Sequence, residues 1–492
     1  MFRTPPVLKQ ASTRITMALS YKLTKKGQIN LPGITNASKT LTEDLLLKDA
    51  QVHHCFFNTA GFHNHLSHHM LAAYDLGAPA VHLQRMYDEE AKEQRPIILD
   101  EKDKSIQVNK DNWIQYLGNH NAYHSFVGYF TEEIKAIGVP KALEKYVFSD
   151  EANAQGVQML VRVVSGAIHP LILLGYGAEF GNDTLIATGL AQAACHKPGA
   201  DFHPEKHTPT GEPISLLHLL SEVYSSDKLK PSMPYDPNAF INARTKAVLD
   251  NGGHEELERL CARYPLPNDV TDAAISQTTE EIIWLATLLT FGTGKKGRKP
   301  RLDFFLMHAL TSSLFLRPLC SVLENPAHKA ALLRVYVPNI MLYVCSRGRP
   351  RIDPELIMSY TDVPRPPNAK LQKPVSSSLG SPLNDGEYDP WPALIAGVLY
   401  HPDAHTIKSM RTLIYGAQHF GTTAAAKVPG AFRNTDEKAE ETHVGMGKVD
   451  GTIFVRAAGV LMDTLGWVAN GQEEGQWDRS ALGWEAAWEN GD

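Results

Sequence analysis

The chain has 492 residues and a nearly balanced charge, with 48 Lys and Arg against 54 Asp and Glu and a net charge of −6. This balance excludes an overall basic field, so we expect no nucleic-acid partner and no binding to an anionic membrane. The length is sufficient for a large buried core. Composition therefore predicts a soluble, cytoplasmic protein that acts on small molecules, and it leaves the oligomeric state open.

The N-terminal arm, residues 1–40, and the cysteines bear on localisation. The first 42 residues contain no Asp or Glu but several Lys and Arg, which faintly resembles an organellar transit segment. Pro5 and Pro6 weaken that alternative, and we expect a loosely packed arm. Five widely spaced cysteines without a CxxC pair predict buried thiols in a reducing compartment.

Apolar residues recur at helical spacing along most of the chain, and little of it alternates as a strand would. The pattern predicts helices over 41–74, 111–148 and 151–197, the last hinged near Gly175–Gly181. Helical patterns resume at 239–263, 270–291, 303–345, 393–425 and 452–470. We therefore predict an all-α fold, with one large domain at 41–470 that encloses a histidine-lined site.

Two stretches interrupt or follow this domain. Residues 347–392 contain many prolines around Ser376–Ser378 and are too long for an ordinary connection, so they predict a loop or lid. Residues 471–492 are expected to form a C-terminal tail.

The densest chemical signal is the run from Phe62 to Tyr74, which holds four histidines within seven residues. If Asn64 caps a helix that starts at His65, then His65 shares a face with His68 or His69, one turn away. That spacing suits a metal pair. The alternative is that some of these histidines are hydrogen-bonded core or cap residues.

A second candidate is His169, which lies with Glu179 in an otherwise apolar stretch where buried polar groups must be paired or coordinated. Pro170 removes a helical hydrogen bond and is expected to bend the chain beside His169. The alternative is a satisfied core histidine. His196 is a reserve ligand that could equally be a cation at a helix C-terminus.

Two further helices carry polar groups in apolar surroundings. His308 and Thr311 share one face of 303–315, where the hydroxyl could orient a bound oxygen or substrate or else bond its own backbone. His405 and Lys408 are neighbours on the helix that follows Pro402. A buried Lys408 would have a lowered pKa and could form a carbamate that binds a metal, whereas an exposed lysine would be ordinary.

Histidines on separate buried helices favour non-haem iron or another imidazole-preferring metal over magnesium or calcium, and zinc stays open. Gly292–Gly297 matches GxGxxG, but it follows a helical run and no strand, so we reject a dinucleotide-binding fold.

Four short motifs follow one another along the chain: His63-Asn64-His65 with His68; His169-Pro170-Leu171-Ile172 followed by Gly175-Tyr176-Gly177 and Glu179-Phe180; Asp303-Phe304-Phe305-Leu306-Met307-His308; and His405-x-x-Lys408-x-x-Arg411. In this order they resemble the questin oxidase-like family of fungal polyketide pathways. The match spans most of residues 50–425. The chain departs from the family pattern at Leu173, where a second histidine often stands.

The resemblance implies an oxidoreductase that uses dioxygen to cleave the ring of an anthraquinone-type polyketide in secondary-metabolite biosynthesis, in a Baeyer-Villiger type oxidation. Members are commonly described as NADPH-dependent, whereas related enzymes are treated as non-haem iron oxygenases. The histidines and the lack of a dinucleotide fold favour Fe(II), with NADPH as an external reductant. The hypothesis takes His65 or His68, His169, His308 and His405 as ligands, with a modified Lys408 as a further candidate ligand, and Thr311 as a catalytic residue.

Two rival hypotheses remain from the sequence. A metal-free NADPH-dependent oxygenase would bind the cofactor near Lys295–Lys299 and would be indifferent to chelators. A non-catalytic helical protein would hold a polyketide without consuming oxygen.

Overall fold

The computed structural model describes residues 22–367, 374–382, 384–433 and 440–489. The first 21 residues of the predicted arm lie outside the described residues. The chain divides into two compact units. The first runs to Gly199 and includes Ser321–Glu324, and the second comprises Ala200–Cys320 and the chain from Asn325 onward.

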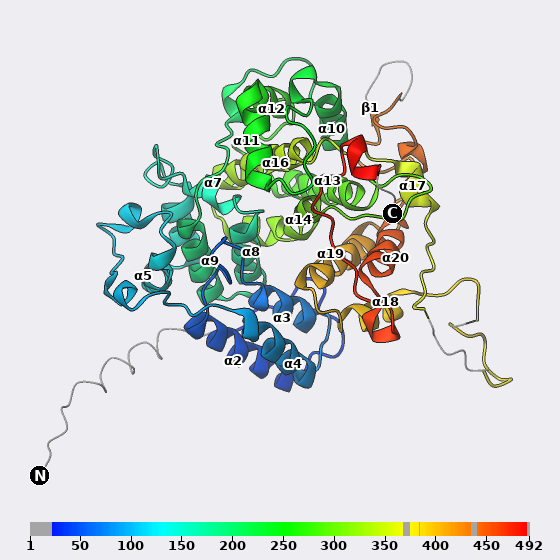
Figure 1. Cartoon of the computed structure of the whole chain (residues 1–492), viewed down its shortest axis with the longest axis horizontal. Helices are drawn as coiled ribbons and strands as arrows, with labels where there is room; N and C mark the ends of the chain where they lie inside the picture. The colour runs from blue at the N-terminus through cyan, green and yellow to red at the C-terminus, as the bar shows by residue number, and fades with distance from the viewer. Residues whose placement is uncertain (1–21, 368–373, 383, 434–439, 490–492) are drawn as a thin grey trace, which may run out of the picture. The chain divides into compact units, whose positions relative to one another are not determined.

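The first unit is built from helices joined by turns and longer loops (Figure 1). Thr35 begins the first of these with a capping box to Ser38. Helices α8 and α9 pack against each other, α5 packs on α9, and α2, α3 and α4 form a second group. The elements are α2 (Asn36–Val52), α3 (Leu66–Asp75), α4 (Ala80–Glu90), η1 (Ala91–Glu93), η2 (Glu101–Ser105), η3 (Trp113–Tyr116), η4 (His120–Ala122), α5 (Tyr123–Ile137), α6 (Val139–Leu143), η5 (Glu144–Phe148), α7 (Met159–Val163), α8 (His169–Phe180) and α9 (Asp183–Cys195).

The predicted continuous helix over 41–74 is wrong. The chain leaves α2 at His53 and is not helical again until α3 begins at Leu66. Asp49 stabilises this connection, because its carboxylate accepts hydrogen bonds from His53 and Asn64 at 2.8 and 3.0 Å. The apolar spacing of the run therefore describes α3 alone.

The predicted hinge within 151–197 is confirmed at Gly181, where α8 ends in the left-handed region with φ of 62°. The expected bend at Pro170 is wrong. Pro170 lies in the first turn of α8, where its missing N–H would have no partner in any case. The break falls earlier, between α7 and His169.

The second unit is also helical. Helices α13, α14, α19 and α20 pack together, and α16 packs on α14, α11 and α12. Its elements are η6 (Pro204–Lys206), α10 (Leu216–Ser225), η7 (Asp227–Leu229), α11 (Ile241–Val248), η8 (Leu249–Gly253), α12 (His254–Cys261), α13 (Asp272–Phe291), α14 (Phe304–Ser313), α15 (Leu316–Val322, which ends in the first unit), α16 (Pro326–Ser346), α17 (Pro354–Ser359), α18 (Trp391–Val398), α19 (Ala404–Phe420), η9 (Met446–Lys448), α20 (Ile453–Leu465), η10 (Val468–Asn470) and η11 (Glu485–Trp488).

The all-α prediction is confirmed, since the described residues contain only the two-residue strands β1 (Phe432–Arg433) and β2 (Glu440–Glu441). All five cysteines are buried free thiols that form no disulfide, as predicted. The proline-rich stretch 347–392 contains α17 and the start of α18.

Among the described residues, no single helix has the length and apolar composition to cross a membrane. The bent pair α14 and α15, which meet at 41°, would meet that test only when taken together.

Candidate active site

Five histidines of the first unit lie together, and we call them the imidazole cluster: His63, His65, His68, His169 and His196. Nε2 of His65 lies 2.9 Å from Nε2 of His169. His63 stacks on His169 with ring centroids 3.7 Å apart and an interplanar angle of 7°, and its Nε2 lies 2.7 Å from Nε2 of His196. The sequence predicted His65, His68 and His169 as ligands, and the fold brings all three into this cluster.

A strained turn presents His169 to the cluster. Gly166, Ala167 and Ile168 all have positive φ, at 57°, 51° and 65°. This region is unfavourable for a β-branched residue such as Ile168, and strain of this kind concentrates at functional sites. A Cβ at Gly166 would lie 2.2 Å from Cε1 of His196, so glycine is required there. The turn and the cluster are therefore one packed arrangement.

Hydrogen bonding fixes the tautomer of His169. Its Nδ1 lies 2.7 Å from the carbonyl oxygen of Gly166. Because a carbonyl can only accept, Nδ1 carries the proton, and the neutral ring has its lone pair on Nε2. Metal-binding histidines are commonly oriented in this way, with the second nitrogen donating to a carbonyl or carboxylate. The lone pair of His169 points toward His65.

The remaining histidines of the run differ in role. His68 lies edge-on to His65 at 5.7 Å and stacks with Tyr176 at 5.4 Å. His69 instead pairs with the carboxylate of Glu90, outside the cluster. Burial lowers the pKa of His196 to about 3, helped by the charges of His120 and Arg162. This favours a neutral His196 over the alternative of a helix-end cation.

The second unit holds the other predicted ligands, on α14 and α19. The rings of His308 and His405 lie 5.3 Å apart at 66°, and Phe304 packs edge-on against both. Nδ1 of His308 donates to the carbonyl of Phe304 at 2.7 Å. Nδ1 of His405 donates to Oδ1 of Asp403 at 2.8 Å. Both rings are therefore held with the lone pair on Nε2, as in His169.

Asp403 organises the surroundings of His405. It is the N-cap of α19, and its Oδ2 accepts from Thr406 N at 3.0 Å, Thr406 Oγ1 at 2.8 Å and Trp477 Nε1 at 2.7 Å. Burial opposes ionisation of Asp403, but the charge of His405 and these hydrogen bonds outweigh it and hold the pKa of the carboxyl well below its usual value. Asp403 is therefore an ionised partner for His405.

The pKa values of the two histidines of this unit are both lowered. Burial lowers the pKa of His308 well below its usual value, and the charges of His405 and Lys408 add to the effect. Burial is also the main cause that lowers the pKa of His405, and the charge of Lys408 is the second. Together they outweigh Asp403, which raises this pKa. A neutral imidazole is the form that binds a metal.

Lys408 and Thr311 are both buried, at 2% and 1% exposed. For Lys408 this meets the condition of the carbamate hypothesis and removes the alternative of an exposed lysine. The Thr311 hydroxyl faces Sδ of Met307 at 3.8 Å.

Other buried histidines show the opposite hydrogen-bond pattern. Nε2 of His54 donates to the carbonyl of His120 at 2.9 Å, and its Nδ1 accepts from Phe56 N at 3.0 Å. His401 likewise donates to the carbonyl of Leu465 at 2.9 Å and accepts from Asp403 N at 3.1 Å. Because both ring nitrogens bond the backbone, these two are structural histidines.

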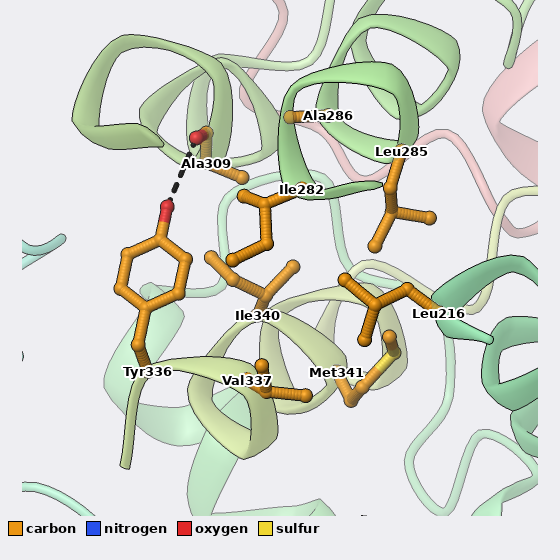
Figure 2. Close-up of a pocket in the computed structure, with 9 residues that line it drawn as sticks. All are labelled: Leu216, Ile282, Leu285, Ala286, Ala309, Tyr336, Val337, Ile340 and Met341. Atoms are coloured by element: carbon orange, nitrogen blue, oxygen red, sulfur yellow. Dashed lines mark hydrogen bonds between the residues drawn. The ribbon is translucent and has the colours of Figure 1, made fainter. Parts of the chain in front are cut away.

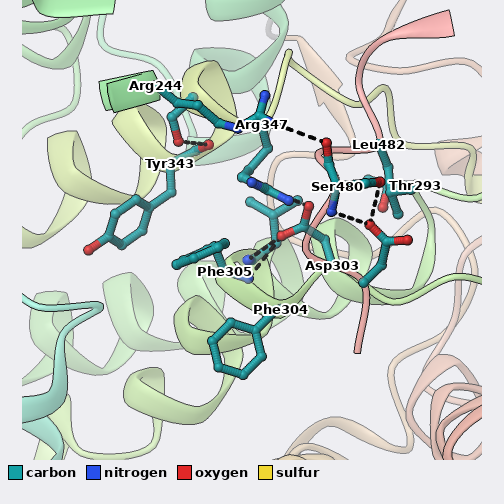
Figure 3. A network of polar contacts seen from close by, with 12 residues as sticks. Arg244, Thr293, Asp303, Phe304, Phe305, Tyr343, Arg347, Ser480 and Leu482 are labelled. Atoms are coloured by element: carbon teal, nitrogen blue, oxygen red, sulfur yellow. Dashed lines mark hydrogen bonds and ion pairs between the residues drawn. The ribbon is translucent and has the colours of Figure 1, made fainter. Parts of the chain in front are cut away.

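The C-terminal segment, residues 477–488, is fixed to α14 and α16 by a polar network (Figure 3). The buried Arg347 donates from Nε to Oδ2 of Asp303 at 2.7 Å, and Asp303 caps α14. Arg244 donates to the carbonyl of Ser480 at 3.1 Å, and Gly483 N donates to the carbonyl of Arg347 at 2.9 Å. The same segment carries Trp477, whose indole donates to Asp403 in a contact that no sequence pattern predicted.

A cavity lies within each unit. The cavity of the second unit has an empty volume of about 240 Å³. It is lined by apolar side chains and Tyr336 (Figure 2). The Tyr336 hydroxyl donates to the carbonyl of Ala309 at 3.1 Å. With no titratable group beyond a satisfied phenol, this cavity offers no acid, base or ligand. The cavity of the first unit is lined by Leu173, His53 and Gln192, among others.

The family comparison agrees with the motif order. The model of the questin oxidase-like family matches residues 62–413. A Baeyer-Villiger monooxygenase of Cryptosporiopsis sp. is 28% identical over 406 residues, which cover 80% of this chain and 84% of the relative. Questin oxidase of Aspergillus fumigatus is 29% identical over 327 residues, covering 64% and 72%. A Baeyer-Villiger monooxygenase of Aspergillus aculeatus is 29% identical over 420 residues, covering 78% and 79%.

The matching family and the relatives named questin oxidase and Baeyer-Villiger monooxygenase define the class, and the protein is an oxidoreductase. The chain belongs to the questin oxidase-like family. The match ends at Leu413, so Asp403 and His405 lie inside it and Trp477 lies outside.

Proposed function

We propose that this protein is an oxygen-dependent oxidoreductase that cleaves the ring of an anthraquinone-type polyketide, with non-haem iron(II) as its cofactor. The relatives named questin oxidase and Baeyer-Villiger monooxygenase support the reaction class. The buried, unbonded cysteines and the absence of a long apolar helix among the described residues agree with a place in the cytosol.

The observation that carries the metal proposal is the shared tautomer of His169, His308 and His405. In each, Nδ1 donates to a carbonyl or carboxylate at 2.7 to 2.8 Å, which directs the Nε2 lone pair away from the backbone. The structural histidines His54 and His401 lack this arrangement. Neutral, oriented imidazoles suit iron(II) better than magnesium or calcium.

The spacing within the first unit also suits a metal. For metal–nitrogen bonds of about 2.1 Å, two ligands at a right angle lie about 3.0 Å apart. The Nε2 atoms of His65 and His169 are separated by 2.9 Å. These two residues would hold the metal in the first unit, with His68 next to them. His308 and His405 are the candidate ligands of the second unit.

Lys408 is the least ordinary candidate of the second unit. Its side chain is buried, and its charge lowers the pKa of both His308 and His405, which supports a position near the two imidazoles. Carboxylation by carbon dioxide would convert this cation into an anion that favours a bound metal. Intact mass and crystal density would reveal the carbamate, and a Lys408→Ala protein with full metal content would contradict its role as a ligand.

Iron(II) would supply the one-electron chemistry with dioxygen that amino-acid side chains lack. Insertion of one oxygen atom beside an aromatic ketone reduces the second atom to water, which consumes two electrons and two protons. We propose NADPH as the external donor, giving NADP⁺. The part of Thr311 in this proposal is to orient dioxygen or the ketone through its hydroxyl.

The test is oxygen consumption by tag-free protein loaded anaerobically with Fe(II), with questin as the probe substrate. The proposal predicts consumption that requires the anthraquinone and is abolished by a chelator. Turnover with NADPH that is indifferent to the chelator would favour a metal-free oxygenase. Binding of questin without oxygen consumption would favour a polyketide-binding protein and would contradict the proposal.

A further inference from the structure

A second group of histidines and carboxylates lies in the second unit, where the loop 201–207 meets helix α12. It comprises His207, His254 and Glu258, with Asp201 and His203 beside them. His254 and Glu258 are one turn apart at the start and middle of α12, so both face the loop. None of these residues belongs to the ligand set considered above.

Two imidazole nitrogens converge on one oxygen of Glu258. Nε2 of His207 lies 2.9 Å from Oε2 of Glu258, and Nδ1 of His254 lies 3.7 Å from the same atom. In a tetrahedral site with metal–ligand bonds of about 2.05 Å, ligand atoms lie about 3.4 Å apart. The two distances to Oε2 bracket this value, and rotation of the partly exposed His207 and His254 side chains would bring their nitrogens to the same separation.

The tautomer of His254 is the second observation. Its Nε2 lies 3.0 Å from the carbonyl oxygen of Asp201, so Nε2 carries the proton. The lone pair of the neutral ring is then on Nδ1, where it faces the carboxylate oxygen of Glu258. Two lone pairs in this position repel each other unless a proton or a cation lies between them. The carbonyl of Asp201 thus orients His254 as a second-shell partner orients a metal-binding histidine.

The neighbouring charges also permit a cation. Nε2 and Nδ1 of His203 lie 3.1 and 3.2 Å from the carboxylates of Asp201 and Glu205. The other oxygen of Glu258, Oε1, accepts from the backbone N of His203 at 2.5 Å. Glu258 is nearly buried, with a side chain 9% exposed, whereas His207 and His254 are 33% and 36% exposed. A metal therefore has access from solvent to a carboxylate that is already held in place.

We propose that His207, His254 and Glu258 form a second metal site, selective for a borderline divalent cation such as Zn²⁺. Two imidazoles and one carboxylate are a donor set that zinc accepts, with a water completing the tetrahedron. Binding would replace the hydrogen bond between His207 and Glu258 with two bonds to the metal. The metal would link the loop 201–207 to α12.

The test is a Zn²⁺ titration of the full chain, expressed without a His tag, stripped of metal and followed by competition with a chromophoric chelator. The background carries His169→Gln and His405→Gln, which removes ligands of the proposed iron site. We expect one equivalent of Zn²⁺ to bind, and His254→Gln and His207→Asn each to weaken binding at least tenfold. The matched control is His328→Gln, a histidine on α16 that should leave the titration unchanged.

Cobalt(II) gives a second readout, because tetrahedral coordination by these residues produces visible absorption that the same two variants should lose. Unchanged Zn²⁺ binding in both His254→Gln and His207→Asn would overturn the proposal, as would the absence of binding to the parent protein. The iron proposal is tested by other residues and a different metal, so either proposal can fail alone.

Discussion

The contact between Trp477 and Asp403 allows a prediction about a residue outside the family match. Replacing Trp477 by Phe keeps an aromatic ring and removes the indole N–H that donates to Oδ2 of Asp403 at 2.7 Å. A hydrogen bond to a charged group contributes about 1.5–3 kcal/mol to stability. We therefore expect the free energy of unfolding to fall by about 2 kcal/mol.

The same change should weaken metal binding. Asp403 keeps its bonds to His405 and Thr406, so it stays ionised but is less firmly oriented. Losing a second-shell partner costs about 10–100-fold in metal affinity, and we expect about tenfold because Trp477 acts through Asp403. The assays are urea denaturation and Fe(II) titration of the purified full chain under anaerobic conditions.

The matched control is Trp488→Phe. Trp488 is also buried in the C-terminal segment, and its indole donates to the carbonyl of Leu482 at 2.9 Å, with no contact to Asp403. The Trp488→Phe variant should lose one indole hydrogen bond and part of its packing, as Trp477→Phe does, while its Fe(II) affinity stays unchanged. Equal Fe(II) affinities in the two variants would refute the positioning role of Trp477.

Three further predictions concern single residues. Gly166→Ala should destabilise the protein by roughly 1–3 kcal/mol in urea denaturation, because its Cβ would meet the His196 ring in a left-handed turn; unchanged stability would contradict the proposed packing. Burial lowers the pKa of His54 to about 4. As the pH falls below about 6.5, the unfolded state therefore binds the proton of His54 before the folded state does, and the free energy of unfolding should decrease by about 2 kcal/mol at pH 5 relative to pH 8. His54→Gln should remove that part of the pH dependence. Thr311→Val should lower oxygen-consumption turnover by about 10-fold or more if the hydroxyl orients a reactant in the transition state, and unchanged turnover would remove Thr311 from the mechanism.

The helices and the candidate histidines followed from local signals. Apolar spacing identified α13, α14, α19 and α20, because each buries a continuous face. His169, His308 and His405 could be predicted as candidates because each lies in an apolar run, where a buried imidazole needs a partner. Asp403 was recognised only as a helix start, although its position two residues before His405 could have suggested the carboxylate–histidine pair.

The turn before His169 and the contact of Trp477 had no such local signal. Ala167 and Ile168 disfavour positive φ, so nothing in their identity predicts a left-handed turn; tertiary packing against His196 imposes it. Trp477 lies 74 residues from Asp403 in the chain, beyond any helical periodicity. The division into two units was likewise invisible, because helical patterns run through it with only an ordinary loop at 198–214.

The most direct test of the central claim is the iron content of tag-free protein in matched glutamine variants. Each pair contrasts a histidine with an oriented Nε2 lone pair against one whose two nitrogens bond the backbone: His169→Gln against His54→Gln, and His405→Gln against His401→Gln. After anaerobic loading, the account predicts near-stoichiometric iron in the parent and in the His54 and His401 variants, and its loss in the His169 and His405 variants. Equal iron content in all folded variants, or no iron in the parent, would contradict it.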